Sequence, residues 1–420
     1  MKVFKFGGAS VNSIDRIKQM ADILKLHNDD KKIVVISAMG KTTNALEKVA
    51  EAFYRNEKEQ ALSLFQQVKT QHLDTAKSLL QNSYSAAEEK MSHLFTEIEW
   101  ALHDKPVKEY DYYYDQVVCA GELFSTTIIS AFLNEQKIHN HWIDVRDVLR
   151  TDDNFREAVI DWTVSAQNVQ QHIIPLFNET NMIVLQGFIG ATDENESTTL
   201  GREGSDYTAA IFANLIDAEN VTIWKDVEGV MNADPKVFPS AKLISELNYD
   251  EVIEMAYYGA QVIHPKTIKP LQNKSIPLLV KCFLDPALPG TVIHNKSIKN
   301  LPPIIVQKNN QALLHLHSRD FSFIGEHKMS RMYHLFVENK VTPSLIQTGA
   351  VSLMVCTDDK SEKTDHLAGE AAEIFDVQVE KGLTLLTIRH YTKALLDEMT
   401  DGKYILLKQQ SPDTVQVLIR

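Results

Sequence analysis

The sequence predicts a layered α/β domain followed by two small α+β modules. The chain opens with a strand-like run at 2–6, a glycine turn, helical apolar spacing over 13–27 and a β-branched run at 32–37. This order of elements is a βαβ unit, whose parallel strands predict helices on both faces of a sheet. Beyond a turn-rich linker at 299–303, the pattern changes to two β-α-β-β repeats of about 60 residues each.

The first part of the chain carries further signals of the same kind. The run at 32–37 contains four consecutive β-branched apolar residues, as in a parallel strand that is buried on both faces. A glycine-free stretch at 41–102 has an apolar stripe at helical spacing, which predicts a wall of helices. Further strands are expected at 141–145, 182–186, 221–224 and 276–280.

The second part is predicted to begin after the linker. We expect one domain over 1–296 and a paired regulatory region over 301–420. The second module is expected to lack its closing helix, because the sequence stops soon after a strand. The strands and helices expected here lie at 312–317, 324–339, 351–356, 383–388, 391–399, 404–407 and 415–419.

Composition excludes several classes of protein. The 420 residues include 43 basic and 56 acidic ones, and the net charge of −13 disfavours a nucleic-acid or anionic-membrane partner. Three distant cysteines provide neither a disulfide framework nor a zinc knuckle, and they fit a reducing compartment. The sequence shows no apolar run of about 18 residues and no signal peptide, so we expect a soluble, cytoplasmic protein without a membrane partner.

Glycine is scarce and unevenly placed. None of the 16 glycines lies between Gly40 and Gly121, and six of the others gather in three loops, at 7–8, 187–190 and 201–204. Glycine is used where the backbone approaches a ligand closely or adopts positive φ. These loops therefore point to a site.

The first glycine loop has the chemistry of a phosphate seat. Lys5 precedes Gly7 and Gly8 at the predicted entry to a helix, so backbone N–H groups, the helix N-terminus and an ammonium converge. The spacing is not that of a P-loop. On this signal alone, an ordinary βα turn is the better interpretation.

The loop at 201–208 is a stronger signal. Ser205 is a good N-cap and Asp206 a good first-turn residue for the helix that follows. A capped helix does not explain Arg202 between two glycines, where a planar guanidinium suits a carboxylate.

Two further segments carry candidate residues. A strand ending near Trp224 leads into an acidic turn and a Pro-closed loop at 233–236, which is common at nucleotide-binding edges. Glu122 lies at a predicted buried helix start, and a buried glutamate is rare unless it is paired.

Together these loops resemble aspartate kinase, a member of the amino-acid kinase superfamily. The matching strings occur in family order up to about residue 293, and the chain beyond 300 resembles paired ACT regulatory modules. The strings are KFGGAS (5–10), SAMGKTTN (37–44), GE (121–122), GREGSDYTAA (201–210), WKDVEGVMNADP (224–235) and GAQVIHPKTI (259–268).

The resemblance implies transfer of the ATP γ-phosphoryl group to the β-carboxylate of L-aspartate, giving 4-phospho-L-aspartate and ADP. This reaction is the first step of lysine, threonine and methionine biosynthesis. The implied catalytic residues are Lys5, Asp206 and Lys225. The implied aspartate-binding residues are Thr43, Asn44, Glu122, Arg202 and Ser205. The implied nucleotide-binding residues are Lys5, Gly7, Gly8, Lys225, Asp226, Met231, Lys236 and Gln261.

Within this set, the resemblance assigns Glu122 to the substrate ammonium and Arg202 to a substrate carboxylate. ATP and Mg²⁺ are the implied cofactors, with the metal carried by ATP and not by protein ligands. The implied assembly is a homodimer formed through the ACT-like modules. No homoserine dehydrogenase segment is recognisable, so we expect a single activity.

The chain departs from the family pattern at three positions near the phosphates. Ala9 stands where threonine is usual, Lys225 where threonine is usual, and Gln261 where lysine is usual. We hypothesise that Lys225 replaces the charge that is lost at Gln261.

The regulatory part also departs from lysine-inhibited relatives, whose effector loop offers acidic side chains. The matching stretch, 341–350, contains no acid, and burying an ammonium without a carboxylate is costly. We therefore expect no ordinary lysine inhibition, and threonine or no effector remains open.

Two other functions remain open at this point. One is a kinase of the same fold that acts on glutamate, acetylglutamate, a nucleotide or carbamate. The other is an amino-acid-sensing protein that has lost turnover. A metal site at His315 and His317 is the weaker interpretation, since two ligands on one strand lack a third.

Overall fold

The computed structural model describes residues 1–261 and 263–420, and these form two compact units. The first unit comprises 1–230, 243–253 and 263–298. The second comprises Met231–Lys242, Glu254–Gln261 and Lys299–Arg420. The assignment of 1–296 as a catalytic domain and 301–420 as a regulatory region stays a prediction.

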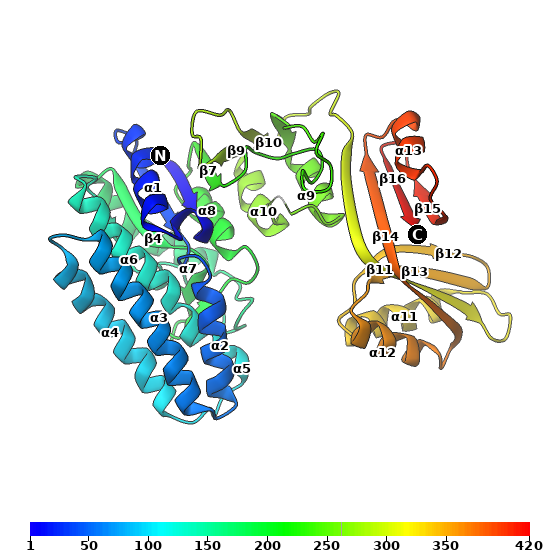
Figure 1. Cartoon of the computed structure of the whole chain (residues 1–420), viewed down its shortest axis with the longest axis horizontal. Coiled ribbons are helices and arrows are strands. Elements are labelled where there is room, and N and C mark those ends of the chain that lie inside the picture. Colours follow the sequence, from blue (N-terminus) through cyan, green and yellow to red (C-terminus); the bar gives the residue numbers. More distant parts are fainter. Residues whose placement is uncertain (262) are drawn as a thin grey trace. The chain divides into compact units, whose positions relative to one another are not determined.

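The first unit is built on an eight-stranded, mostly parallel sheet (Figure 1). Its order is β3-β4-β2-β1-β7-β9-β10-β8, and within it β10 runs antiparallel to β9. The strands are β1 (Lys2–Phe6), β2 (Lys32–Ile36), β3 (His141–Trp142), β4 (Met182–Gln186), β7 (Asn220–Lys225), β8 (Glu246–Asn248), β9 (Leu278–Cys282) and β10 (Thr291–His294). A separate hairpin pairs β5 (Ile189–Ala191) with β6 (Ser197–Thr199).

The predicted strands are present with small shifts, except that β3 is only two residues long. The expected strand at 141–145 ends early because Asp144 caps a short 3₁₀ turn, Val145–Asp147, by accepting from the Arg146 N–H at 3.0 Å. A capped turn satisfies backbone groups that a strand would pair with a neighbour.

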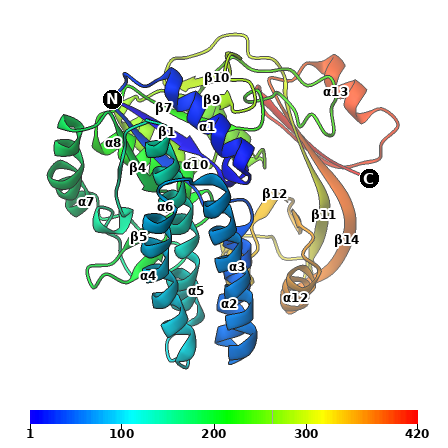
Figure 2. The same ribbon diagram turned by 60° about the vertical axis from the view of Figure 1, so that its left-hand side comes forward.

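Helices cover both faces of this sheet, which confirms the predicted fold class. The predicted wall of helices at 41–102 is formed by α2, α3 and α4, and Figure 2 shows them side by side with α5. The helices in chain order are α1 (Ile14–Leu26), α2 (Thr42–Tyr54), α3 (Lys58–Leu79), α4 (Tyr84–His103), α5 (Tyr110–Val118), α6 (Ala120–Glu135), α7 (Trp162–Asn168), α8 (Gly204–Leu215), α9 (Tyr249–Tyr257) and α10 (Pro265–Lys274). Short turns of other helix types are η1 (Gly8–Val11), η3 (Val169–Ile173) and η4 (Ile174–Asn178).

Strand alternation decides which side chains of β1 face which helix layer. Phe4 and Phe6 join the large apolar cluster that contains residues of α1 through α6. Successive side chains of a strand point to opposite faces, so Lys5 points to the other face. Helix α8 packs on β1, β2 and β7, and its first turn carries Asp206.

Helices α5 and α6 form one nearly continuous rod. Cys119, between them, keeps helical backbone angles of φ −55° and ψ −26°. The span Tyr110–Glu135 is long and apolar enough to cross a membrane, but 89% of its most apolar window is buried inside the unit. The sequence predicted no such segment, because polar and charged residues, among them Asp115 and Glu122, interrupt its apolar residues. It is the core helix of this unit.

The second unit contains one six-stranded antiparallel sheet in the order β12-β13-β11-β14-β16-β15. Its strands are β11 (Ile304–Ser318), β12 (Pro343–Thr348), β13 (Ser352–Asp358), β14 (Phe375–Arg389), β15 (Ile405–Gln410) and β16 (Thr414–Ile419). Its helices include α11 (Glu326–Glu338), α12 (Ser361–Ala371) and α13 (Lys393–Thr400). These elements confirm two α+β modules.

The two modules share their central strands, which the sequence did not reveal. Strands β11 and β14 have 15 residues each, and their pairing shifts register between Lys308 and Leu313. The expected strands at 312–317 and 383–388 are therefore too short, because the polar residues at the bulge look like a strand end. Helix α12 was missed, since only Thr364, Leu367 and Ala371 of its 11 residues are buried.

Two aromatic residues of α4 provide a test of the packing. Phe95 is 1% exposed and contacts Phe65 and Phe124, whereas Trp100 is 73% exposed. We expect Phe95→Ala to lower the free energy of unfolding by about 3–5 kcal/mol, and Trp100→Ala to change it by less than about 0.5 kcal/mol. Urea unfolding followed by circular dichroism measures both. Equal shifts in the two variants would contradict the described burial of α4.

Candidate active site

The carboxyl ends of four parallel strands meet at one edge of the first sheet. Phe6 is paired with Ile36 and Trp224, and Ile36 is paired with Gln186, so β1, β2, β4 and β7 end level with one another. The loops that follow these strands therefore gather at the same edge. This is the edge where ligands bind in open α/β sheets.

An ion cluster of three predicted catalytic residues lies at this edge. Lys5 Nζ is 2.6 Å from Asp206 Oδ1, and Lys225 Nζ is 3.6 Å from Asp206 Oδ2. Asp206 is 3% exposed, and burial acts to raise its pKa, but the ammonium groups of Lys5 and Lys225 outweigh burial and lower it. The structure thus brings together a carboxylate held ionised between two lysines, from α8, β1 and β7.

The first glycine loop turns tightly beside this cluster. A side chain at Gly8 would bring its Cβ to 2.7 Å from the Ala38 carbonyl oxygen, and Gly40 N–H donates to the Gly8 carbonyl at 3.1 Å. The predicted helix entry differs in detail. A four-residue 3₁₀ turn, Gly8–Val11, comes first, and α1 begins only at Ile14, capped by Ser13.

The loop before α8 is shaped by left-handed backbone. Gly201 and Glu203 have φ of 76° and 54°, and α8 begins at Gly204. The prediction that Ser205 is the N-cap is therefore wrong. Glu203 takes that place without a side-chain cap bond, and its Oε2 accepts from the His264 N–H at 2.9 Å.

Ser205 instead packs in the first turn of α8, while Arg202 lies on the surface. A Cβ on Gly187 would be only 2.5 Å from the Ser205 Cβ, so the turn after β4 must be glycine. This close approach fixes the start of α8 against the sheet edge, with Arg202 exposed beside it.

Glu122 lies in the first turn of α6 and is 2% exposed. Its Oε1 accepts a long hydrogen bond of 3.4 Å from the Ala38 N–H, and its Oε2 has no hydrogen-bond partner among the described residues. Burial raises the pKa of Glu122 to about 8. A buried carboxyl that is bonded so incompletely is an unsatisfied site that a positively charged group would complete.

The start of α2 lies against the start of α6. A Cβ on Gly121 would be 3.1 Å from Thr42 Cγ2, so the two helix ends nearly touch. Thr43 and Asn44 occupy the first turn of α2. The structure therefore brings these two predicted aspartate-binding residues to the helix end that carries Glu122.

The remaining predicted residues fall into two groups. Asp226 follows β7 directly and is exposed. Met231, Lys236 and Gln261 belong to the second compact unit, so their nucleotide-binding role stays a prediction. Within 1–261 and 263–420, no group of three or more His, Cys, Asp or Glu residues could hold a metal ion.

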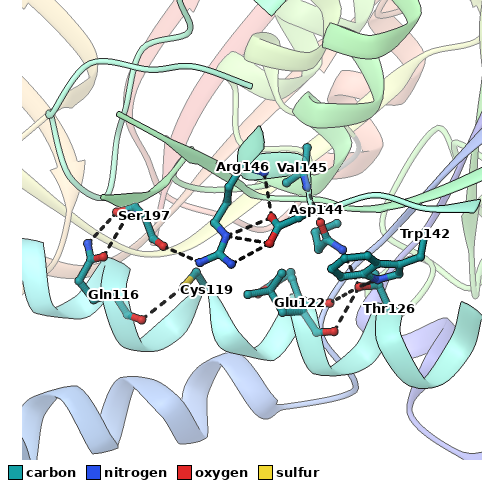
Figure 3. Close-up of polar contacts among 11 residues, drawn as sticks. Gln116, Cys119, Glu122, Thr126, Trp142, Asp144, Val145, Arg146 and Ser197 are labelled. Carbon is teal, nitrogen blue, oxygen red and sulfur yellow. Dashed lines mark hydrogen bonds and ion pairs between the residues drawn. The ribbon is translucent and has the colours of Figure 1, made fainter. Parts of the chain in front are cut away.

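Sequence reasoning missed two residues of α5 that face the site loops. Asp115 is fully buried and accepts hydrogen bonds from Arg156 and Thr199. The Gln116 side chain accepts from the backbone N–H of Ser197 and donates to the Ser197 carbonyl. Figure 3 shows Gln116 reaching Ser197 from the same helical rod as Glu122. The available signal was a spacing of seven residues between Asp115 and Glu122, which places both on one helix face.

Residues 1–282 match the model of the amino acid kinase family, which is two thirds of the chain. The chain therefore belongs to the amino acid kinase family.

Within this family, the chain is similar to known aspartokinases. The lysine-sensitive aspartokinase 3 of Escherichia coli is 32% identical over 400 residues, covering 92% of this chain and 86% of that protein. The structure of Escherichia coli aspartokinase III with lysine and aspartate (T-state) matches at 29% identity with a TM-score of 0.83, covering 100% of this chain and 95% of that one. The same enzyme with aspartate and ADP (R-state) matches with a TM-score of 0.82, also at 29% identity, covering 100% and 96%. The resemblance to aspartate kinases is thus confirmed.

The raised pKa of Glu122 has a measurable effect on stability. Because the folded protein keeps this proton up to about pH 8 while an unfolded glutamate loses it near pH 4.5, the carboxyl destabilises the fold as pH rises between these values. We expect Glu122→Gln to gain stability relative to wild type over this window, by up to about 1.4 kcal/mol per pH unit. Urea unfolding at pH 5, 7 and 8 measures the difference. A constant difference across pH would contradict a raised pKa.

Proposed function

We propose that this sheet edge carries out the aspartate kinase reaction, transferring the γ-phosphoryl group of ATP to the β-carboxylate of L-aspartate. The observation that carries the proposal is the ion cluster of Lys5, Asp206 and Lys225 beside the Gly7–Gly8 turn. Membership of the aspartokinase group supports it, and the related Escherichia coli enzyme has been solved with aspartate and ADP. The chain is thus an ATP-dependent phosphotransferase with a carboxyl acceptor.

The phosphoryl transfer requires no covalent intermediate with the protein. A carboxylate oxygen of aspartate attacks the γ-phosphorus, and the bond from that phosphorus to the β–γ bridging oxygen breaks, releasing ADP. The acceptor is already ionised at neutral pH, so no general base is required. Catalysis then consists of holding two anions together and balancing the negative charge that spreads over the transferring group.

The ion cluster suits that task. Asp206 holds Lys5 and Lys225 close together against their mutual repulsion. Both ammonium groups are then in place before the phosphates arrive, which avoids the cost of reorganising them during the reaction. The tight turn at Gly8 brings backbone N–H groups to the same edge for the phosphate tail.

The aspartate pocket is proposed on the α6 side of the edge. Glu122 would bind the substrate ammonium, and Arg202 would bind a substrate carboxylate, with Thr43, Asn44 and Ser205 completing the pocket. Since burial keeps Glu122 protonated in the empty site up to about pH 8, binding of the ammonium would expel a proton from it.

Several finer predictions are kept as proposals. Mg²⁺ would arrive with ATP and be held by phosphate oxygens and water, as it usually is at phosphate sites. Met231, Lys236 and Gln261 are proposed to contact the nucleotide, as the resemblance implies. We also propose a homodimer that forms through the ACT-like modules, a regulatory role for these modules and a cytoplasmic location.

The test of the function is ADP release by the purified chain with ATP and Mg²⁺. We expect release with L-aspartate and trapping of the acyl phosphate by hydroxylamine, with no comparable rate for glutamate, acetylglutamate or carbamate. A rate that prefers one of those acceptors would favour another amino-acid kinase. Aspartate binding without ADP release would favour an amino-acid sensor.

Lys225 provides a sharper test of the site. We expect Lys225→Ala to lower kcat about 100-fold, because one of two cations at the transferring group is lost. Lys281→Ala is the matched control, since Lys281 is paired with Trp224 on the neighbouring strand and has no role in the proposed cluster. Steady-state ADP release measures both variants.

The same experiment examines whether Lys225 replaces the charge missing at Gln261. Adding Gln261→Lys to the Lys225→Ala variant should restore part of the lost turnover. Unchanged turnover in Lys225→Ala would exclude the replacement outright.

Lysine inhibition tests the regulatory part. The stretch 341–350 contains no acidic residue. The loop before α11 is bonded to the end of this stretch, because the Ile324 N–H donates to the Ala350 carbonyl at 2.9 Å. Asp320 lies in that loop, but it is already paired with Lys328 at 3.1 Å. We therefore expect no loss of initial rate when lysine is added at physiological concentration. Lysine inhibition like that implied by the name of the Escherichia coli relative would contradict this expectation.

A further inference from the structure

The polar face of the α5–α6 rod contacts backbone segments that lie far from it in the sequence. Asp115 and Glu122 are seven residues apart, which is two helical turns, so they lie on one face of the rod. Figure 3 shows Gln116, Cys119, Glu122 and Thr126 along this rod, facing Ser197 and the segment around Arg146. Glu122 lies in the first turn of α6, near the middle of the rod, and Asp115 lies two turns earlier in α5.

Asp115 connects two backbone segments that are far apart in sequence. Its Oδ2 accepts from the N–H groups of Arg156 at 2.9 Å and Thr199 at 2.8 Å, and its Oδ1 accepts from the Thr199 hydroxyl at 2.7 Å. The residue is fully buried, so water does not compete for these bonds. Burial raises the pKa of Asp115 to about 6, although these hydrogen bonds lower it.

Both bound segments lie next to the turn that carries Arg202. Thr199 precedes Arg202 by three residues, and its carbonyl accepts from the Ala158 N–H at 3.0 Å. A Cβ on Gly201 would be 3.1 Å from the Arg156 carbonyl oxygen, so the segment of Arg156 lies directly against this turn. Arg156 itself has a left-handed backbone with φ 69°, a conformation that needs support from its surroundings.

We propose that Asp115 is a positioning residue for the aspartate pocket, tying the turn that carries Arg202 to the same rigid helix that carries Glu122. The proposal deepens the proposed function, because it rests on Arg202 and Glu122 holding opposite ends of the substrate. Asp115 contacts neither substrate nor nucleotide in this scheme. Its effect is to fix the distance between the groups that bind the substrate carboxylate and ammonium.

The hydrogen-bond geometry predicts which substitution of Asp115 keeps the segments of Arg156 and Thr199 connected. The asparagine side chain of an Asp115→Asn variant can accept both backbone N–H groups on its oxygen and donate its amide to the Thr199 hydroxyl, which only has to reverse its direction. Asp115→Ala leaves two buried N–H groups without an acceptor, which is costly and frees both segments.

Gln116 supplies a matched control on the same helix. It makes two bonds to the same strand, from its Nε2 to the Ser197 carbonyl at 2.8 Å and from the Ser197 N–H to its Oε1 at 3.0 Å. Gln116 is half-buried, and its partner Ser197 is two residues further from Arg202 in the sequence than Thr199 is. Gln116→Ala therefore weakens the attachment of strand β6 without releasing the turn that carries Arg202.

The test is steady-state kinetics of the full chain with both substrates varied. We expect Asp115→Ala to raise the KM for aspartate about 10- to 100-fold, with the KM for ATP changed by less than about threefold. Asp115→Asn and Gln116→Ala should each keep the KM for aspartate within about threefold of wild type. An unchanged KM for aspartate in Asp115→Ala would overturn the proposal. So would a result in which both variants, Asp115→Ala and Gln116→Ala, raise the KM for aspartate and the KM for ATP by the same factor.

Hydrogen exchange keeps the proposal testable if Asp115→Ala does not fold. In wild type and Asp115→Asn without ligand, the amides of Arg156 and Thr199 should exchange slowly, and fast exchange of either amide in wild type would overturn the proposal. Absence of ADP release by wild type would count against the proposed function alone, because amide exchange and calorimetric binding of aspartate still report on Asp115.

Discussion

The ion cluster around Asp206 is the constraint on which the rest of this site depends. A carboxylate that is 3% exposed is tolerable only when it is paired, and here it is paired with two lysines from neighbouring parallel strands. The N-terminal end of α8 also favours a negative charge at this position. Two anionic substrates of an acidic chain need a local concentration of positive charge, and this carboxylate is what holds that charge in place.

The second constraint is a rigid helix with a polar face. The rod over Tyr110–Glu135 is apolar enough to resemble a membrane segment, yet its polar face meets partners along its length. Thr126 accepts from Trp142 Nε1 at 2.9 Å and from Gln186 Nε2 at 2.7 Å, just beyond Glu122. Because the rod is surrounded by packed apolar side chains, its polar residues cannot drift relative to one another. Glu122 is the member of this face whose Oε2 lacks a partner in the part of the chain that the structure describes.

Much of the fold could be predicted from local sequence patterns. The strand Lys2–Phe6 and the strand Met182–Gln186 were predicted at their observed bounds. Each is a short run rich in β-branched, aromatic or other apolar residues, and a run of this length is typical of a strand. Local patterns failed where tertiary contacts override them. Ser205 is a good N-cap by composition, but the left-handed residues at Gly201 and Glu203 start the helix two residues earlier, with Glu203 at the N-cap. Helix α12 was not recognisable because so few of its residues reach the core.

The sequence by itself determined the fold class, the glycine loops, the family and the identities of the charged candidates, because each of these is recorded in nearby residues or in ordered motifs. Tertiary structure alone decided which of those candidates meet. Lys5, Asp206 and Lys225 are separated by up to 220 positions, and they converge only because β1 and β7 are neighbours in the sheet and alternation turns Lys5 toward α8. Asp115 shows the same limit. Its spacing from Glu122 is visible in the sequence, but its bonds to Arg156 and Thr199 exist only once the hairpin strand β6 packs on α5.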